Sequence, residues 1–203
     1  METTSIAKQA NGAAAANAAG SPLQQKALAF RARHGADGAS APEAGLHCIL
    51  DPSDVPQLLK EAGETDPFLQ AAATLHDMLQ VAAVTEADIA AVFGTEVAYI
   101  VAEVTDNPRL SPVTRKALRL TIAPHMSRKA KLLKLAQLVA SVRNLGGSFA
   151  PATWDARQRL DFFHWVERFA ASVGVLNPTL QAVMLAELER ARLSVGAAMP
   201  KLR

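Results

Sequence analysis

Apolar residues recur along the central part of the chain at the spacing of an α-helix. The clearest stripe consists of Leu132, Leu135, Leu138, Val142 and Leu145. Apolar positions three or four residues apart lie on one helix face, and the Gly146-Gly147 pair that follows is a common helix end. Segments that alternate between apolar and polar residues are scarce. The pattern therefore predicts an all-α fold.

Five steps along the chain place a side chain that can cap a helix directly before a proline. They are Ser21-Pro22, Asp51-Pro52, Asp66-Pro67, Ser111-Pro112 and Asn177-Pro178. The first residue can accept a hydrogen bond from an unpaired backbone amide, and proline suits the first helical position because it has no N–H to leave unpaired. Thr85 and Asp88 have the spacing of a capping box. Helices are therefore predicted near residues 22–34, 52–62, 67–82, 86–93, 94–106, 112–122, 128–145, 154–173 and 178–195.

The two ends of the chain differ in composition from the part between them. Residues 1–20 are rich in Ala, Asn and Gly, and they lack the bulky apolar block of a secretory signal. Such a segment cannot bury enough surface to become ordered. Residues 196–203 form a second short tail. We therefore expect one helical domain over residues 21–195, between two disordered tails.

Composition narrows the class of protein. The chain has 203 residues, half of them hydrophobic, and a formal net charge of +2. This length suffices for one domain with a sizeable core, and the small charge excludes a broadly basic protein that coats nucleic acid. No apolar run approaches the length of a membrane span. The single cysteine, Cys48, excludes a disulfide framework and a cysteine-rich zinc site. A soluble cytoplasmic protein is expected, without membrane or nucleic-acid partners.

Aromatic residues are concentrated near the C-terminal end. Six of the ten are Phe149, Trp154, Phe162, Phe163, Trp165 and Phe169. They could form a platform on which nucleotide bases stack, or they could seal the core with large side chains. The second interpretation is favoured because aromatic side chains carry the largest apolar area.

Positive charge is concentrated in residues 111–145. The eight basic residues there are Arg115, Lys116, Arg119, Arg128, Lys129, Lys131, Lys134 and Arg143, and the stretch holds no Asp or Glu. The rest of the chain carries 13 of the 21 basic residues against 19 acidic ones. Either these side chains, with Lys131 and Lys134 as candidates, bind an anionic ligand or a charged partner surface, or acidic residues packed against them balance their charge.

The pair His76-Asp77 is the one compact candidate for metal chemistry. It lies in LQAAATLHDMLQ, which the pattern places on a largely apolar helix. An imidazole and a neighbouring carboxylate can share a divalent ion if other helices supply further ligands. A His-Asp dipeptide alone is weak evidence, because chance and buried polar pairing also produce it.

The surroundings of this pair are more specific. They comprise LQAAATLHD, VFG (92–94), EVTDNPRL (103–110), APHMSRKAKLLKLA (123–136) and WDARQRLDFFHWV (154–166). In these motifs the chain resembles the HD-domain family, in particular the small alarmone hydrolases related to the hydrolase half of RelA/SpoT proteins. The resemblance implies a helical bundle of about nine to ten helices. It also implies bound manganese and removal of the 3′-pyrophosphate from guanosine tetra- and pentaphosphate.

The metal ligands that the resemblance implies are only partly present. His76 and Asp77 match the family's pair, Asp51 stands where the first His belongs, and Gln137 stands where the last Asp belongs. Asp51 could donate an oxygen to the ion or cap the helix that begins at Pro52. The amide oxygen of Gln137 is a weaker ligand than a carboxylate. We therefore expect manganese to be weakly bound or absent.

The implied catalytic groups are missing. Gln80-Val81 replace the Glu-Asp pair that handles the attacking water in the family, and neither side chain exchanges a proton near neutral pH. No basic residue stands between Arg33 and Lys60, where the family has a basic pair that meets the substrate phosphates. In the implied nucleotide pocket, Ser141 replaces an Asn, whereas Arg143 agrees. The comparison therefore predicts no catalytic residue.

Three hypotheses on function remain open. In the first, the chain is a degenerate alarmone-hydrolase-like pseudoenzyme that acts by binding a guanine nucleotide, another anionic ligand, a protein partner or a second copy of itself. In the second, it is an active manganese phosphohydrolase in which Glu86 or Asp88 manages the water. In the third, it is a structural interaction module whose pocket is filled by apolar side chains such as Met78, Leu79 and Val81.

Overall fold

The fold was analysed in a computed structural model, which describes residues 21–34, 53–80, 84–147 and 154–198. Within these ranges the chain forms nine α-helices and no strand, so the predicted all-α class is confirmed. The helices are α2 (Pro22–His34), α3 (Asp54–Glu61), α4 (Pro67–Thr74), α5 (Glu86–Phe93), α6 (Thr95–Val104), α7 (Pro112–Ile122), α8 (Arg128–Gly146), α9 (Ala156–Val173) and α10 (Pro178–Ala198). Two single 3-10 turns, η2 (Met78–Gln80) and η3 (Ala123–His125), separate some of them. None of the described helices is long and apolar enough to cross a membrane.

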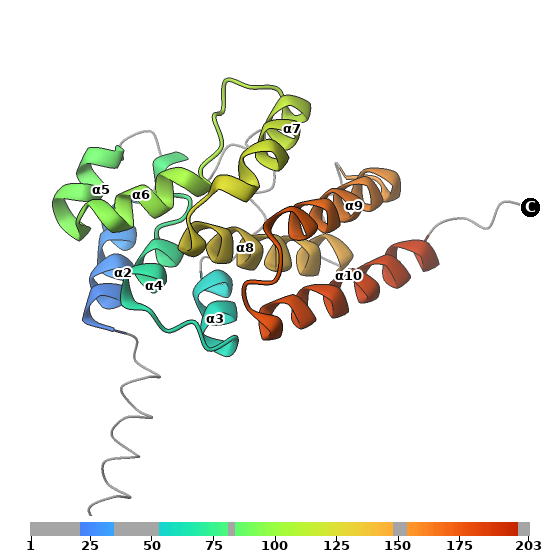
Figure 1. The fold of residues 1–203 in the computed structure, drawn as a ribbon, viewed down its shortest axis with the longest axis horizontal. Coiled ribbons are helices and arrows are strands. Elements are labelled where there is room, and N and C mark those ends of the chain that lie inside the picture. Colours follow the sequence, from blue (N-terminus) through green and yellow to red (C-terminus); the bar gives the residue numbers. More distant parts are fainter. Residues whose placement is uncertain (1–20, 35–52, 81–83, 148–153, 199–203) are drawn as a thin grey trace, which may run out of the picture.

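Helix α8 is the centre of the bundle. Thirteen of its 19 residues are buried, including the whole predicted stripe from Leu132 to Leu145. It contacts α3, α4, α6, α9 and α10, and Figure 1 shows it running between α9 and α10 on the right and α2, α4, α5 and α6 on the left. Because the helix is buried on most sides, its apolar residues are expected from packing alone, whereas its buried polar residues are unusual and point to a possible site.

The approach of α8 to α10 depends on one glycine. A Cβ at Gly146 would lie 2.4 Å from the Cβ and 2.7 Å from the Cα of Ala191. Contacts this short cannot be accommodated without moving the backbone of α10. Gly146 therefore does more than end the predicted stripe, because it also allows the two helices to pack.

The predicted helix starts are largely confirmed. Side chains of the residues before proline accept hydrogen bonds from backbone amides three residues ahead, as in Asp66 with Leu69 (2.9 Å) and Asn177 with Leu180 (2.9 Å). Ser21 and Ser111 do the same. Thr85 and Asp88 form the predicted capping box.

Several predicted bounds are wrong. Helix α3 begins at Asp54 with Ser53 at its N-cap position, so the predicted start at residue 52 is too early. Helix α6 is shorter than 94–106, α9 begins two residues late because Asp155 caps it, and α10 continues to Ala198. The predicted tail 1–20, Cys48, Asp51, Val81 and Phe149 lie outside the described residues.

The largest difference concerns the predicted helix 67–82, because α4 ends at Thr74. Side chains occupy the carbonyl groups of its last turn: His76 Nδ1 lies 2.8 Å from the oxygen of Ala73, and Arg31 donates to the oxygen of Thr74 at 3.2 Å. A helix ends where its last carbonyls find partners other than the next backbone amides. The apolar pattern of this segment hides that exchange, since every residue from Leu69 to His76 is buried.

The aromatic residues near the C-terminal end belong to the core. Phe162, Phe163 and Phe169 on α9 are fully buried, which confirms the core interpretation for these three. Trp154 and Trp165 are half-buried and lie against Phe162, with ring centroids 5.9 and 5.7 Å away. These rings support α7, because Trp165 Nε1 donates to the carbonyl oxygen of Lys116 at 3.1 Å.

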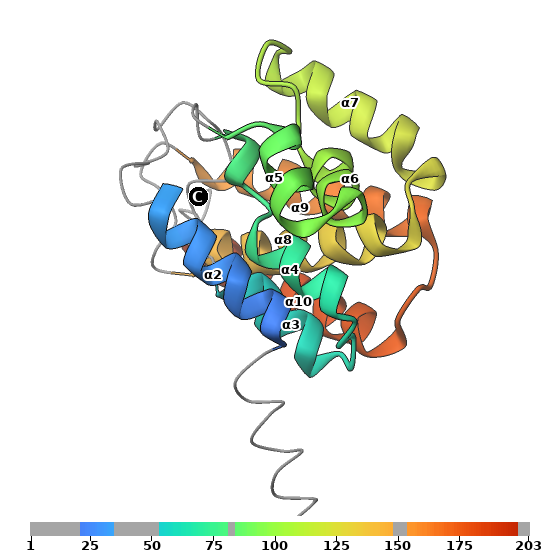
Figure 2. The ribbon, with the colours of Figure 1, turned by 90° about the vertical axis from the view of Figure 1, so that its left-hand side faces the viewer.

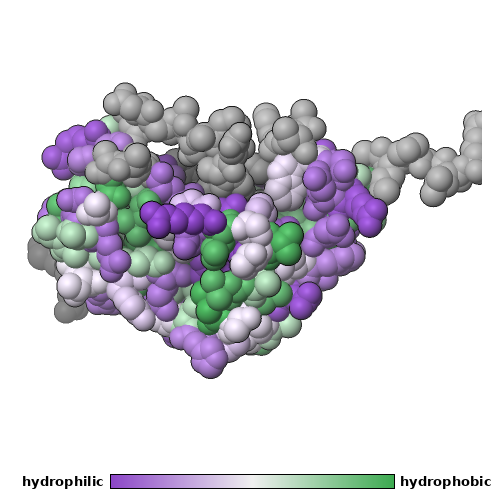
Figure 3. Space-filling model, turned by 90° about the horizontal axis from the view of Figure 1, so that it is seen from above, coloured by the Kyte–Doolittle hydropathy of each residue, from purple (hydrophilic) through white to green (hydrophobic). Residues whose placement is uncertain are grey.

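Helix α7 is the most loosely packed helix in the described part of the chain. It lies at the upper edge of the bundle in both ribbon views (Figures 1 and 2), and its one buried residue is Arg119. Val113 is 78% exposed and Leu118 is 46% exposed. The view from above, onto the side of α7, accordingly shows apolar surface in its centre (Figure 3). The helix is thus held mainly by its contact with α9 and by the side chain of Arg119.

Candidate functional site

His76 and Asp77 lie in the turn between α4 and η2, not on a helix as predicted. The turn is buried beneath the bundle surface, and His76 is only 1% exposed. Its Nδ1 contact with the carbonyl oxygen of Ala73 fixes the plane of the ring, since a carbonyl oxygen can only accept a hydrogen bond. The turn thus presents the imidazole and the neighbouring carboxylate from a fixed backbone.

The carboxylate of Asp77 is bound by the guanidinium of Arg31. Arg31 Nη2 donates to Oδ2 at 2.7 Å, and Nη1 donates to Oδ1 and also to the carbonyl oxygen of Thr74. Burial raises the pKa of Asp77, but the hydrogen bonds from Arg31 and the charges of His76 and Arg31 outweigh it, so the pKa lies below its usual value. Asp77 is therefore ionised at neutral pH, and an arginine supplies its counter-charge.

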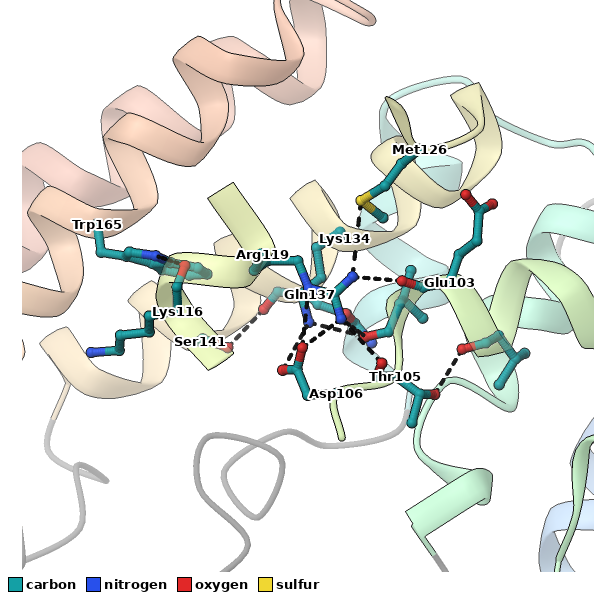
Figure 4. Close-up of polar contacts among 12 residues, drawn as sticks. Glu103, Thr105, Asp106, Lys116, Arg119, Met126, Lys134, Gln137, Ser141 and Trp165 are labelled. Carbon is teal, nitrogen blue, oxygen red and sulfur yellow. Dashed lines mark hydrogen bonds and ion pairs between the residues drawn. The ribbon is translucent and has the colours of Figure 1, made fainter. Parts of the chain in front are cut away.

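A second polar cluster lies where α6, α7 and α8 meet (Figure 4). Its centre is Arg119, which is 4% exposed and donates to the carbonyl oxygens of Val104 (3.2 Å) and Thr105 (3.1 Å), and to that of Glu103. Its Nε also donates to the carboxylate of Asp106 at 3.0 Å. Arg119 therefore binds the carbonyl groups at the end of α6, which no backbone amide of that helix can reach.

Lys134 of α8 lies in the same cluster. It is 5% exposed, its Nζ donates to the carbonyl oxygen of Val104 at 3.2 Å, and it lies 3.8 Å from the carboxylate of Asp106. Burial lowers the pKa of Lys134 to about 8; Asp106 opposes this shift and the charge of Arg119 adds to it. Two buried cations thus share the carboxylate of Asp106.

Gln137, one helical turn after Lys134, has the least satisfied side chain of the cluster. It is 3% exposed, and neither its amide oxygen nor its amide nitrogen has a hydrogen-bond partner among the residues that the structure describes. Its backbone oxygen accepts a hydrogen bond from Ser141 Oγ at 2.8 Å. Gln80 at the end of η2 likewise has an amide nitrogen without a partner. Gln24 Oε1 is a third such atom. Buried polar atoms normally find partners, so each of these amides is a position at which a water molecule or a ligand atom could be bound.

Acidic residues balance most of the basic stretch, as the second interpretation expected. Ion pairs join Arg119 to Asp106, Arg128 to Glu64, Lys129 to Asp66 and Glu96, Lys134 to Asp106, and Arg143 to Glu187. The remaining candidate ligand-binding residue, Lys131, donates to the carbonyl oxygen of Pro124. Within the described residues, no hydrogen bond or ion pair joins any two of Lys131, Lys134, Ser141 and Arg143. Their role in ligand binding therefore stays a prediction.

Two residues of these clusters were not anticipated from the sequence. Arg31 stands in the last turn of its helix, where a basic residue has the general effect of stabilising the helix dipole. Arg119 lies in the basic stretch 111–145, where the sequence does not distinguish a buried arginine from an exposed one. Asp77 lies 46 residues from Arg31, and Asp106 lies 13 residues before Arg119 in the segment after α6, so only the fold shows the two pairings.

The buried ammonium of Lys134 is expected to make stability depend on pH. Its pKa is about 8 in the folded chain and about 10.5 when exposed. Between these values the unfolded chain holds the proton that the folded chain has lost, so the free energy of unfolding should rise with pH, by on the order of 2 kcal/mol. Urea unfolding of wild type and Lys134→Met at about pH 8 and about pH 10 measures this. The rise should be smaller in Lys134→Met and retained in Lys131→Met, a half-buried control on the same helix; an equal rise in all three proteins would contradict the assignment.

Comparison with known proteins identifies relatives of this chain. The chain is 35% identical over 134 residues to the guanosine-3′,5′-bis(diphosphate) 3′-pyrophosphohydrolase MESH1 of Xenopus tropicalis, covering 66% of this chain and 74% of the relative. It is 33% identical over 141 residues to the human MESH1, covering 69% and 78%. The chain belongs to the HD-domain alarmone hydrolase family. This confirms the family predicted from the motifs.

Solved structures agree with membership of the alarmone hydrolase family. A metazoan orthologue of SpoT that hydrolyses ppGpp superposes with a TM-score of 0.70 at 26% identity, covering 83% of this chain and 95% of that one. A protein of Listeria monocytogenes EGD-e shares the fold, with a TM-score of 0.58 at 23% identity over 70% of this chain and 98% of that one. No protein-family profile matches the chain.

The described residues at the position that the family motif assigns to the metal do not by themselves fit a divalent ion. Within the described ranges, no group of three or more His, Cys, Asp and Glu side chains could hold one. Both oxygens of Asp77 are engaged by Arg31, and Gln137 offers a neutral amide where the alarmone hydrolase motif has a carboxylate. Asp51 lies outside the described residues.

Proposed function

We propose that the chain is a non-hydrolysing member of the alarmone hydrolase family that binds a guanine nucleotide or a related anionic ligand. Its relatives are named for hydrolysis of guanosine-3′,5′-bis(diphosphate). Two positions that the family motif reserves for carboxylates hold the neutral amides of Gln80 and Gln137. An amide neither exchanges a proton near neutral pH nor binds a divalent ion strongly, so the chemical step lacks its acid-base group.

The observation that carries the proposal is the unpartnered amide of Gln137. A pocket filled by apolar side chains would favour an apolar or fully hydrogen-bonded residue here, because a buried polar atom without a partner costs about 1–3 kcal/mol. An amide that keeps its oxygen and nitrogen unpaired at 3% exposure is instead ready to accept from and donate to a ligand. This favours ligand binding over the structural module.

The charge of the neighbouring cluster supports an anionic ligand. Arg119 and Lys134 are both buried, and Asp106 is the carboxylate that both of them contact among the described residues. An excess of buried positive charge is stabilised by a bound anion, because the attraction acts at low dielectric.

The active-enzyme alternative requires another residue to handle water. Glu86 and Asp88 are both exposed at the start of α5, and Asp88 is held in the capping box by Thr85. Neither side chain lies among the buried polar residues that carry the proposal. The relatives' activity nevertheless makes hydrolysis the alternative that an experiment must exclude. We propose in addition that the protein acts in the cytoplasm, and that a protein partner or a second copy of the chain is another molecule that it binds.

The experiment measures hydrolysis and binding of guanosine tetraphosphate by the full chain, with and without Mn²⁺. We expect saturable heat in calorimetry and no product release. Gln137→Leu should weaken binding roughly tenfold or more, whereas Gln57→Leu, at an exposed position of α3, should not change it. Turnover on the order of 1 per second would overturn the non-hydrolysing assignment. Absence of any binding heat would overturn ligand binding and leave the structural module.

A further inference from the structure

Helix α2 holds Arg31 against the turn that carries Asp77. Gln24, Ala27 and Arg31 are spaced three and four residues apart, so they share the face of α2 that packs on α4 (Figure 2). Gln24 contacts Gln70 of α4 at 3.4 Å, and Phe30 packs edge-on against Phe93 at a centroid distance of 5.3 Å. The guanidinium therefore reaches Asp77 from a helix that several contacts hold in place.

The pair has the geometry of a strong charge-assisted contact. Both carboxylate oxygens accept from separate guanidinium nitrogens, and Nη1 is additionally anchored on the carbonyl oxygen of Thr74. The two side chains are only 20% and 18% exposed, which limits solvent screening. Asp77 thus has its charge neutralised from within the chain.

This arrangement conflicts with a divalent ion at the same carboxylate. An ion bound to the oxygens of Asp77 would stand within a few ångströms of the guanidinium, where like charges repel. Arginine cannot relieve the repulsion by losing a proton, since its side chain stays protonated in proteins. To bind there, the ion would have to break both hydrogen bonds from the guanidinium of Arg31 to Asp77 and push the side chain of Arg31 aside.

We propose that Arg31 is a built-in counter-ion that takes the place of a divalent metal ion beside His76 and Asp77 and excludes it. This goes beyond the proposed ligand binding and does not depend on which ligand binds. If so, removal of one positive charge should open a site for the ion at Asp77. A change confined to Arg31 therefore tests the assignment directly.

The test measures binding of Mn²⁺ alone to the full chain, by calorimetry and by the loss of the electron paramagnetic resonance signal of free Mn²⁺. Wild type should show no saturable binding at micromolar concentrations. Arg31→Gln should bind Mn²⁺ at least roughly tenfold more tightly than wild type, and adding Asp77→Asn to that variant should abolish the gain. Arg31→Lys, which keeps the charge, and Arg33→Gln, an exposed arginine of the same helix, should behave like wild type.

Each outcome decides the proposal. A gain in Arg31→Gln that needs Asp77 supports it. Micromolar binding of Mn²⁺ by wild type overturns it without any variant, and folded Arg31→Gln without a gain overturns it as well, with circular dichroism as the check on folding. An equal gain in Arg33→Gln would reduce the effect to net charge and also overturn it. Hydrolysis of guanosine tetraphosphate by wild type would contradict the proposed function instead, so the two failures are distinguishable.

Discussion

Replacement of Arg119 by methionine is expected to lower the free energy of unfolding by about 3–5 kcal/mol. The guanidinium binds Asp106 and three carbonyl oxygens at the end of α6 while being 4% exposed. Its loss removes the hydrogen bonds that Arg119 gives to the carbonyl oxygens of Glu103 and Thr105, and it leaves Lys134 to contact Val104 and Asp106 without Arg119. The cost of an unpaired buried group exceeds the net gain of a hydrogen bond. Methionine keeps much of the aliphatic volume, so the change isolates the polar contacts.

The matched control is Arg115→Met, one turn earlier on α7. Arg115 is half-buried, and the described contacts include no hydrogen bond or ion pair from its side chain. Its replacement should change stability by about 0.5 kcal/mol or less. Urea unfolding followed by circular dichroism gives both values. Equal effects at the two positions would show that the cluster adds nothing to stability.

Phe163→Ala is expected to cost a similar amount, about 3–5 kcal/mol, for a different reason. The ring is fully buried on α9, and truncation removes its transfer free energy and leaves a cavity that rigid neighbours cannot fill. Phe68→Ala is the control, because Phe68 is 38% exposed and its ring lies beside the ammonium group of Lys129. It should cost about 1 kcal/mol or less. Thermal unfolding compares the two, and a large loss only at Phe68 would contradict the assignment of the core.

Helix starts could be predicted from the sequence because their signals are local. A capping side chain, the proline after it and the amide three residues on lie within one turn, as at Asp66 and Asn177. The end of α4 could not be predicted in the same way. It depends on Arg31, 43 residues away from Thr74, and on a histidine whose partner is a carbonyl group. Apolar periodicity does not record such contacts, since all residues of the segment are buried whether or not the helix continues.

The candidate site shows the same division. The motif around His76 and Asp77 predicted the family, which the relatives confirm, and it predicted where a site would lie. The sequence did not reveal the contacts of these residues. Arg31 neutralises Asp77, and the amide of Gln137 has no hydrogen-bond partner among the described residues. A sequence shows directly which residues replace those of a family motif. A charge that another helix supplies can be recognised only once the packing of the helices is known.

The placement of the indole groups has a practical consequence. Trp154 and Trp165 are the two tryptophans of the chain, and both lie beside Lys116 of α7, one under its ammonium and one on its carbonyl oxygen. Intrinsic fluorescence is therefore a local probe of the α7–α9 contact, while far-ultraviolet ellipticity averages over every helix. If α7 detaches before the bundle melts, the emission will shift at a lower denaturant concentration than the ellipticity, and the two curves will not superimpose.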